Sequence, residues 1–179
     1  MARGFTFLFW GLIFIFVDVR IDRFEIAPDF IGYALIALGA HFLWQYTRDF
    51  RKAQYIALAL IPFSLLAFAR PPPVPQVLAI PEAVLSFVMV WILIGALITF
   101  SEERDRPVFA DYMRICRRFY AGIAVFAFFL DQAARFEPEK AGEFLHFVAM
   151  ASVVLLGFIL WVLYAMKQEF TSGSAVTSH

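Results

Sequence analysis

Apolar residues gather into six long stretches along this chain, and short loops rich in charged residues separate them. The stretches are Phe5–Val17, Phe30–Trp44, Tyr55–Ala69, Val77–Phe100, Phe119–Leu130 and Phe144–Met166. The hydrocarbon core of a bilayer takes about 20 helical residues to cross. The fourth and sixth stretches reach that length, and the others reach it only if their helices continue past a charged residue. The pattern predicts an all-α membrane bundle of six transmembrane helices in one domain, residues 1–170, with a flexible tail, residues 171–179.

The composition also indicates a membrane protein. Hydrophobic residues make up 62% of the chain, 23 residues are Phe, and the mean hydropathy is +0.75. A water-soluble domain of this size cannot bury that many apolar side chains. The first stretch leads into Asp18-Val19-Arg20 rather than a small-residue cleavage site, so we expect it to remain as a span. Cys116 is the only cysteine, which excludes an intrachain disulfide.

The charges of the loops predict the orientation of the chain in the membrane. Consecutive spans run in opposite directions, so the loops alternate between two faces. One face receives ten of the 15 Lys and Arg residues, namely Arg3, Arg48, Arg51, Lys52, Arg104, Arg106, Arg114, Arg117, Arg118 and Lys167. Because basic residues are enriched in cytoplasmic loops, this face and both termini are predicted to be cytoplasmic. The opposite loops are predicted to be net acidic.

The segment Pro107–Phe119 has a pattern of its own on the cytoplasmic side. Its apolar residues recur at helical spacing, while Arg114, Arg117 and Arg118 lie on other faces of the predicted helix. We interpret it as an amphipathic helix that lies in the inner headgroup layer and contacts membrane lipids. The alternative is a coupling helix that docks on a cytoplasmic partner, such as a larger membrane complex.

The string from Val17 to Tyr33, between the first two stretches, allows two structures. As a helix it would carry an acidic stripe. As an extended segment, Asp18–Asp22 alternates polar with apolar residues, and a turn at Asp22-Arg23 would form a hairpin. The hairpin register places Ile21 opposite Phe24 and Arg20 opposite Glu25, which pairs apolar with apolar and plus with minus. We therefore favour the hairpin, with Asp29 in the first turn of the next helix.

The same string resembles a motif of a group of small, uncharacterised bacterial membrane proteins with six spans. In that group an Asp-x-Arg-Ile hairpin leads into Phe-Asp-Ile-Leu-Pro-Asp-x-Ile-Gly-Tyr. The matching residues here are Asp18-Val19-Arg20-Ile21 and Phe24-Glu25-Ile26-Ala27-Pro28-Asp29-Phe30-Ile31-Gly32-Tyr33. The chain differs in having Asp22-Arg23 where Asn-Gly is usual, Glu25 for Asp and Ala27 for Leu. The resemblance implies a multi-pass protein of the bacterial cytoplasmic membrane and implies no activity.

Motifs of enzymes and of metal sites are absent from the sequence. There is no His-Glu-x-x-His, no Gly-rich phosphate loop and no Gly-x-Ser-x-Gly elbow. The histidines His41, His146 and His179 fall at separate places and do not form a ligand set. We therefore expect no catalysis, no cofactor and no bound metal. Neutral net charge and the lack of a basic soluble domain disfavour nucleic acid as a partner.

Acidic residues near the outer ends of the spans are the candidate binding groups. Asp131 interrupts an apolar stretch at the exit of the fifth span, Asp29 follows Pro28 at the start of the second, and Asp18 lies beside them in the hairpin. Charged groups at that depth are costly unless they face protein or water. We hypothesise that they bind a cation or a basic or hydroxylated small molecule, with Glu82 as a further carboxylate, in a transport or capture protein. The alternatives are that Asp131 pairs with Arg135 while Asp29 caps a helix, and that the protein is a non-catalytic accessory or regulatory membrane subunit.

Overall fold

Six α-helices make up most of the described part of the protein. A computed structural model describes residues 1–16, 20–21, 24–25, 29–68, 76–134 and 138–172. The helices are α1 (Ala2–Phe16), α2 (Asp29–Leu43), α3 (Asp49–Phe68), α4 (Gln76–Glu102), α5 (Pro107–Ala134) and α6 (Pro138–Ser172). Each corresponds to one of the six apolar stretches, which confirms the prediction of an all-α protein with six helices. The expected tail beyond Ser172 lies outside the described residues.

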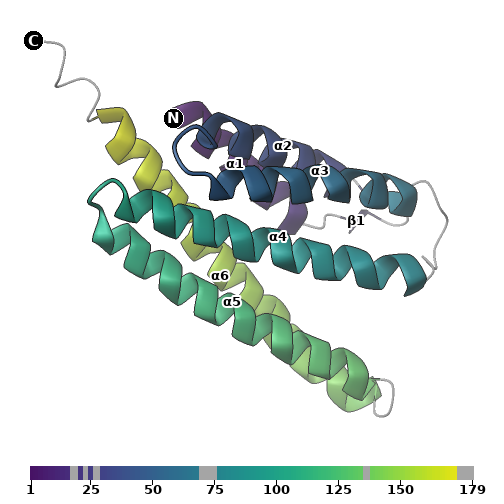
Figure 1. Ribbon diagram of the computed structural model, residues 1–179. Helices are drawn as coiled ribbons and strands as arrows, with labels where there is room; N and C mark the ends of the chain where they lie inside the picture. The colour runs from purple at the N-terminus through teal and green to yellow at the C-terminus, as the bar shows by residue number, and fades with distance from the viewer. Residues whose placement is uncertain (17–19, 22–23, 26–28, 69–75, 135–137, 173–179) are drawn as a thin grey trace, which may run out of the picture.

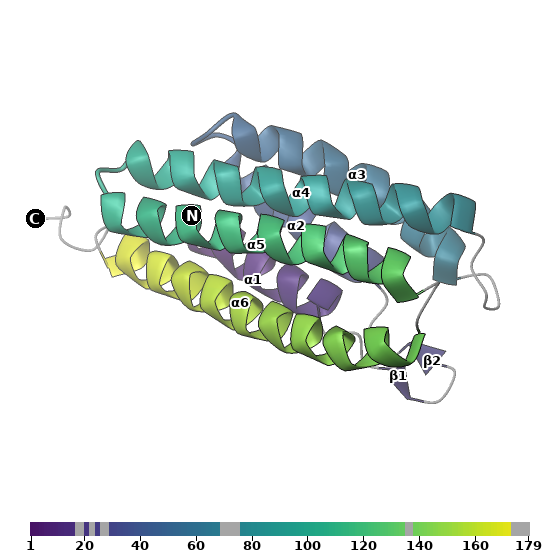
Figure 2. The same ribbon diagram turned by 90° about the horizontal axis from the view of Figure 1, so that it is seen from below.

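Successive helices run antiparallel, and each packs against the next in the chain. The sixth helix returns against α1, so the helices close into a ring of neighbours. The start of α1, the end of α6, the α2–α3 turn and the α4–α5 turn lie at one end of the bundle (Figures 1 and 2). We call this the inner end and the opposite end the outer end. The even number of antiparallel helices therefore places the start of α1 and the end of α6 together.

A short hairpin joins α1 to α2. Strands β1 (Arg20–Ile21) and β2 (Phe24–Glu25) pair antiparallel, with Arg20 opposite Glu25 and Ile21 opposite Phe24. The hairpin and its register are confirmed, and the alternative of a continuous helix with an acidic stripe is wrong. The predicted turn residues Asp22 and Arg23 lie outside the described residues.

Four glycines set the distance between α1 and α2. Gly4 and Gly11 in α1 face Gly39 and Gly32 in α2. A Cβ atom built on Gly11 would lie 2.9 Å from the carbonyl oxygen of Gly32, and one on Gly32 would lie 2.9 Å from the carbonyl oxygen of Gly11. A Cβ on Gly39 would lie 2.9 Å from the carbonyl oxygen of Gly4. Only glycine allows two helix backbones to approach this closely.

The spacing of these glycines explains why both pairs meet. In each helix they are seven residues apart, which is two turns, so they lie on one face. Because the helices are antiparallel, Gly4 of α1 meets Gly39 of α2, and Gly11 of α1 meets Gly32 of α2. The close approach leaves Leu8 and Ile36 fully buried beside the backbones.

An aromatic cluster around Phe100 joins the helices at the inner end. The ring of Phe100 is fully buried in α4. Four rings from other elements approach it at centroid distances of 5.2 to 6.3 Å, with interplanar angles that place them edge to face: Phe5 of α1, Tyr46 of the α2–α3 turn, Phe50 of α3 and Phe170 of α6. Edge-to-face pairs add to the stabilisation from burial alone. One side chain of α4 thus connects three other helices.

Polar contacts fix the loops around this cluster. The Arg104 guanidinium lies 5.1 Å from the ring centre of Tyr46 and 5.2 Å from that of Phe100. The Thr47 hydroxyl, which is buried, donates a hydrogen bond of 2.8 Å to Glu103. Arg106 pairs with Glu169 of α6 at 2.7 Å. The inner end is therefore held by aromatic, cation–π and ionic contacts together.

The segment 107–119 forms the first part of α5, which continues without a break to Ala134, and is not a separate helix. Part of its apolar face, Ala110, Met113 and Cys116, is completely buried, whereas Val108 and Phe119 are 58% and 63% exposed. Packing inside a bundle produces the same 3.6-residue pattern as contact with a membrane surface. Contact of this segment with lipid or with a partner therefore stays a prediction.

The glycine contact generates the first prediction. Gly11→Ala places a methyl group 2.7 Å from a side-chain carbon of Ile36 and 2.9 Å from backbone atoms of α2. Overpacking of this kind costs roughly 1–3 kcal/mol, so the free energy of unfolding in micelles should fall by about 2 kcal/mol. Gly157→Ala is the matched control, because a Cβ there meets no atom within 4 Å. If the two variants unfold at the same denaturant concentration, the glycines do not set the α1–α2 distance.

Candidate functional site

The three carboxylates expected at the outer end are described to different extents. Asp29 is the first residue of α2, as expected, and is half-buried. Asp131 lies in the last turn of α5, but its side chain is outside the described part of the chain. Asp18 is also outside it. The convergence of Asp18, Asp29 and Asp131 therefore stays a prediction.

Other polar groups do meet near Asp29, on three helices. Tyr33 of α2 is only 3% exposed, and Ser86 of α4 lies near its hydroxyl. The carboxylates of Asp29 and Glu82 lie close enough to Tyr33 to interact with it electrostatically, and so does Tyr120 of α5. We call Asp29, Tyr33, Glu82, Ser86 and Tyr120 the outer polar cluster.

The outer polar cluster combines two kinds of chemistry. Carboxylates provide negative charge and acceptors for a cation or a protonated amine, while Tyr and Ser hydroxyls both donate and accept hydrogen bonds. Asp29 and Glu82 were expected from the sequence, whereas Tyr33, Ser86 and Tyr120 were not. The spacing held one signal: Tyr33 follows Asp29 by four residues, so the two lie on one face of a helix. Ser86 of α4 and Tyr120 of α5 come near Tyr33 only through the packing of the helices, which the sequence pattern does not show.

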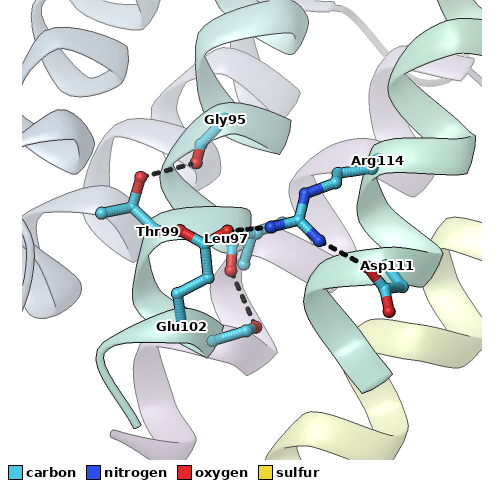
Figure 3. Close-up of polar contacts among 7 residues, drawn as sticks. Gly95, Leu97, Thr99, Glu102, Asp111 and Arg114 are labelled. Atoms are coloured by element: carbon cyan, nitrogen blue, oxygen red, sulfur yellow. Dashed lines mark hydrogen bonds and ion pairs between the residues drawn. The ribbon is translucent and has the colours of Figure 1, made fainter. Parts of the chain in front are cut away.

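The three arginines predicted to contact lipid or a partner have different surroundings. Arg114 reaches from α5 to Glu102 of α4 and also pairs with Asp111 one turn earlier (Figure 3). Its charge is thus matched by carboxylates of the same chain. Because the pairs are about half exposed, they contribute less than about 1 kcal/mol each.

Arg117 packs inward on an aromatic ring. Its guanidinium carbon lies 4.0 Å from the ring centre of Trp91 in α4, which is a close cation–π contact. A Cβ built on Gly95 would lie 3.7 Å from the Arg117 Nη1 atom, an ordinary van der Waals distance, so the guanidinium packs close to Gly95 of α4. The Arg117 Nε atom is buried and has no hydrogen-bond partner. The ring of Trp91 is therefore the main partner of this charge among the described residues.

Arg118 borders a hollow between α5 and α6 with a volume of about 670 Å³. Its other walls are almost wholly apolar: Phe119, Gly122, Ile123, Phe126, Phe147, Val148 and Ala151. A Cβ on Gly122 would meet no atom within 4 Å. We call this hollow the α5–α6 groove.

The outer halves of α5 and α6 leave the rest of the bundle. Among the described side chains, none of α5 after Cys116 and none of α6 before Leu156 is buried. Phe128 and Phe147, for example, are 63% and 64% exposed. Figure 1 shows the outer ends of α5 and α6 standing apart from those of α3 and α4. We call residues 119–134 and 138–155 the α5–α6 arm.

Within the described residues, no group of three or more His, Cys, Asp or Glu side chains is arranged to hold a metal ion. His41 forms a 3.4 Å contact with Gln54 of α3 and lies beside the ring of Trp44, on the surface. Comparison of the chain with protein-family models, with curated proteins and with solved structures finds no match.

The Arg117 environment generates the second prediction. Trp91→Leu and Arg117→Met each remove one partner of the cation–π pair, and the double variant removes both. A double-mutant cycle on the free energy of unfolding should give a coupling energy of about 1 kcal/mol, because the pair is partly desolvated. If the effects of the two substitutions simply add, Arg117 is held by something other than Trp91.

Proposed function

We propose that this protein spans a bacterial cytoplasmic membrane six times, with both termini in the cytoplasm. Pro81–Glu102 and His146–Phe170 are long and apolar enough to cross a membrane, each with a mean hydropathy of 2.5. The helices α1 and α2 are apolar but have 15 residues each, about 22 Å, so the bilayer thins around them. The antiparallel order supports alternating spans, because it gathers the loops rich in Lys and Arg at the inner end.

This orientation is tested by cysteine accessibility. The native Cys116 is 0% exposed, so it is a poor probe and is replaced by Ser. Lys52→Cys, in an exposed turn of α3, should react with a membrane-impermeant maleimide only in inside-out vesicles. Lys140→Cys, in the first turn of α6, should react in intact cells. Reaction of Lys52→Cys in intact cells would reverse the orientation, and reaction of both would argue against the six spans.

Within this framework, we propose that the outer polar cluster binds a small cation or a basic or hydroxylated molecule from the outer side. The observation that carries this proposal is Tyr33, a buried residue whose hydroxyl lies near Ser86 of another helix and near the carboxylates of Asp29 and Glu82. Ionisable groups within membrane helices are costly, and they commonly mark the path or the site of a solute. Asp18 and Asp131 are proposed as further members of the site.

The proposed role is capture or transport without catalysis. Asp29 and Glu82 supply the charge that attracts a cationic solute, and the acidic outer loops raise its local concentration. The hydroxyls of Tyr33, Ser86 and Tyr120 orient the bound molecule, because each donates and accepts hydrogen bonds. The burial of Tyr33 strengthens its contacts relative to contacts in water.

A second candidate function is that of an accessory membrane subunit. The α5–α6 arm favours it, because no described side chain in the arm is buried and large aromatic residues cover its surface. A partner helix could pack on this surface through van der Waals contacts, as helices do in lipid. The arm shares only Tyr120 with the outer polar cluster, so the two functions can be tested separately through Asp29 and Glu82 on one side and the exposed aromatic residues of the arm on the other.

The solute proposal predicts ligand-dependent stabilisation. Purified protein in nanodiscs is screened by thermal unfolding against inorganic cations, amines and polyols. A solute at about 100 times its Kd should stabilise the protein by about 2.7 kcal/mol. The double variant Asp29→Asn, Glu82→Gln should lose most of that stabilisation, because it removes both charges that attract the solute.

Asp49→Asn is the matched control. Asp49 is also the first residue of a helix, α3, but it lies at the inner end beside Lys52. The control should keep the ligand effect of the unaltered protein. If every stabilising solute acts equally on the double variant, the site is not at Asp29 and Glu82, and the accessory function becomes the better account.

A further inference from the structure

Arg51 of α3 is held between two aromatic rings at the inner end of the bundle. Its guanidinium carbon lies 5.6 Å from the ring centre of Trp44, the residue after α2, and 5.6 Å from that of Tyr55, one turn further along α3. The Arg51 Nε atom donates a hydrogen bond of 3.0 Å to the Tyr55 hydroxyl. These contacts orient the side chain, while its two terminal Nη groups have no hydrogen-bond partner among the described residues. Those groups are therefore free to donate to an anion.

The rings around Arg51 lie at the surface, and they are of the kind found at a membrane boundary. Trp44 and Tyr55 are 42% and 56% exposed, and the ring of His41 lies 6.4 Å from that of Trp44. Trp and Tyr gather at the headgroup level of a bilayer, because each has an apolar ring and a polar group that forms hydrogen bonds. Trp44 follows α2 directly and Arg51 lies in the first turn of α3, so both lie where the chain leaves the proposed spans.

The charges beside these rings are unbalanced. Residues 44 to 55 include three basic side chains, Arg48, Arg51 and Lys52, but only one carboxylate, Asp49. Asp49 pairs with Lys52 at 2.6 Å, and no described carboxylate pairs with Arg48 or Arg51, which are both exposed. Two guanidinium groups at the inner end therefore lack a negative partner within the described chain, and phosphate oxygens are acceptors that fit them.

We infer that Trp44, Arg48, Arg51 and Tyr55, which we call the α2–α3 patch, bind the headgroup phosphate of one anionic phospholipid in the leaflet at the inner end. Arg51 donates hydrogen bonds to the phosphate oxygens, and Arg48 adds a second positive charge. The exposed rings contact the glycerol and the first carbons of the acyl chains. Anionic lipids are favoured over zwitterionic ones because they bring a net negative charge to the two arginines. This leaflet is the cytoplasmic one in the proposed orientation, and in that respect alone the inference rests on the proposed function.

The test uses the purified full-length protein in detergent and counts retained lipids by native mass spectrometry. The protein is given equal amounts of phosphatidylglycerol, which is anionic, and phosphatidylcholine, which is zwitterionic. We expect one retained phosphatidylglycerol, preferred about 25-fold, because two basic residues contribute about fivefold each. Arg51→Gln should reduce the preference to about fivefold, and the double variant Arg48→Gln, Arg51→Gln should reduce it to about one.

Arg3→Gln is the matched control. Arg3 is also exposed at the inner end, in the first turn of α1, but no described ring lies over its guanidinium. This variant removes an equal charge and should leave the preference unchanged, and excess inorganic phosphate should not displace the lipid. The inference is overturned if the double variant still selects phosphatidylglycerol, if Arg3→Gln lowers the preference as much as Arg51→Gln does, or if inorganic phosphate displaces the lipid. The lipid count in detergent depends neither on the orientation in the membrane nor on solute binding at Asp29 and Glu82.

Discussion

The contact between α1 and α2 is the constraint on which the rest of the bundle depends. In lipid, helices gain nothing by leaving an apolar solvent, so their association depends on close packing. The two glycine pairs allow that packing, because a Cβ on Gly11, Gly32 or Gly39 would lie 2.9 Å from a backbone oxygen of the opposite helix. Direct backbone approach also permits Cα–H···O contacts, which add a small amount per contact. The hairpin β1–β2 joins the same two helices at the outer end, so α1 and α2 form a unit against which α3 and α6 pack.

Much of this fold could be predicted from the sequence, and the errors have physical causes. The six helices followed from apolar runs, and the hairpin register followed from pairing Arg20 with Glu25. The segment 107–119 was expected to be a helix of its own but is continuous with α5, because an amphipathic pattern does not distinguish a membrane surface from the interior of a bundle. The seven-residue spacing of the glycines was visible in the sequence, but its significance depends on two helices facing each other.

The candidate sites were less predictable than the fold. Asp29 and Glu82 could be named as outer carboxylates, yet their common neighbour Tyr33 becomes apparent only when α2 and α4 pack. The three arginines near residue 115 looked equivalent in the sequence. In the structure Arg114 meets carboxylates, Arg117 meets the ring of Trp91, and Arg118 borders an apolar groove. A spacing of one residue turns a side chain by about 100° around the helix, which explains these different surroundings.

The two ends of the molecule differ in how their polar groups are used. At the inner end, Thr47, Arg104 and Arg106 make contacts that fasten loops to helices. At the outer end, the buried Tyr33 of α2 lies near half-buried polar groups of α4 and α5. The contacts at the inner end stabilise the fold. Taking polar groups out of water at the outer end costs free energy, and a binding function would explain that cost.

The central claim is that the outer polar cluster is reached by water from the outer side of the membrane. Electron paramagnetic resonance can test this without a known solute, by measuring collisions of a spin label with a polar relaxation agent and with oxygen. In a Cys116→Ser background, a label at Ser86 should collide more with the polar agent. A label at Val84, 55% exposed and two residues away on another face of α4, should collide more with oxygen dissolved in lipid. If both labels favour oxygen, the cluster is closed to water and the account of a solute site is contradicted.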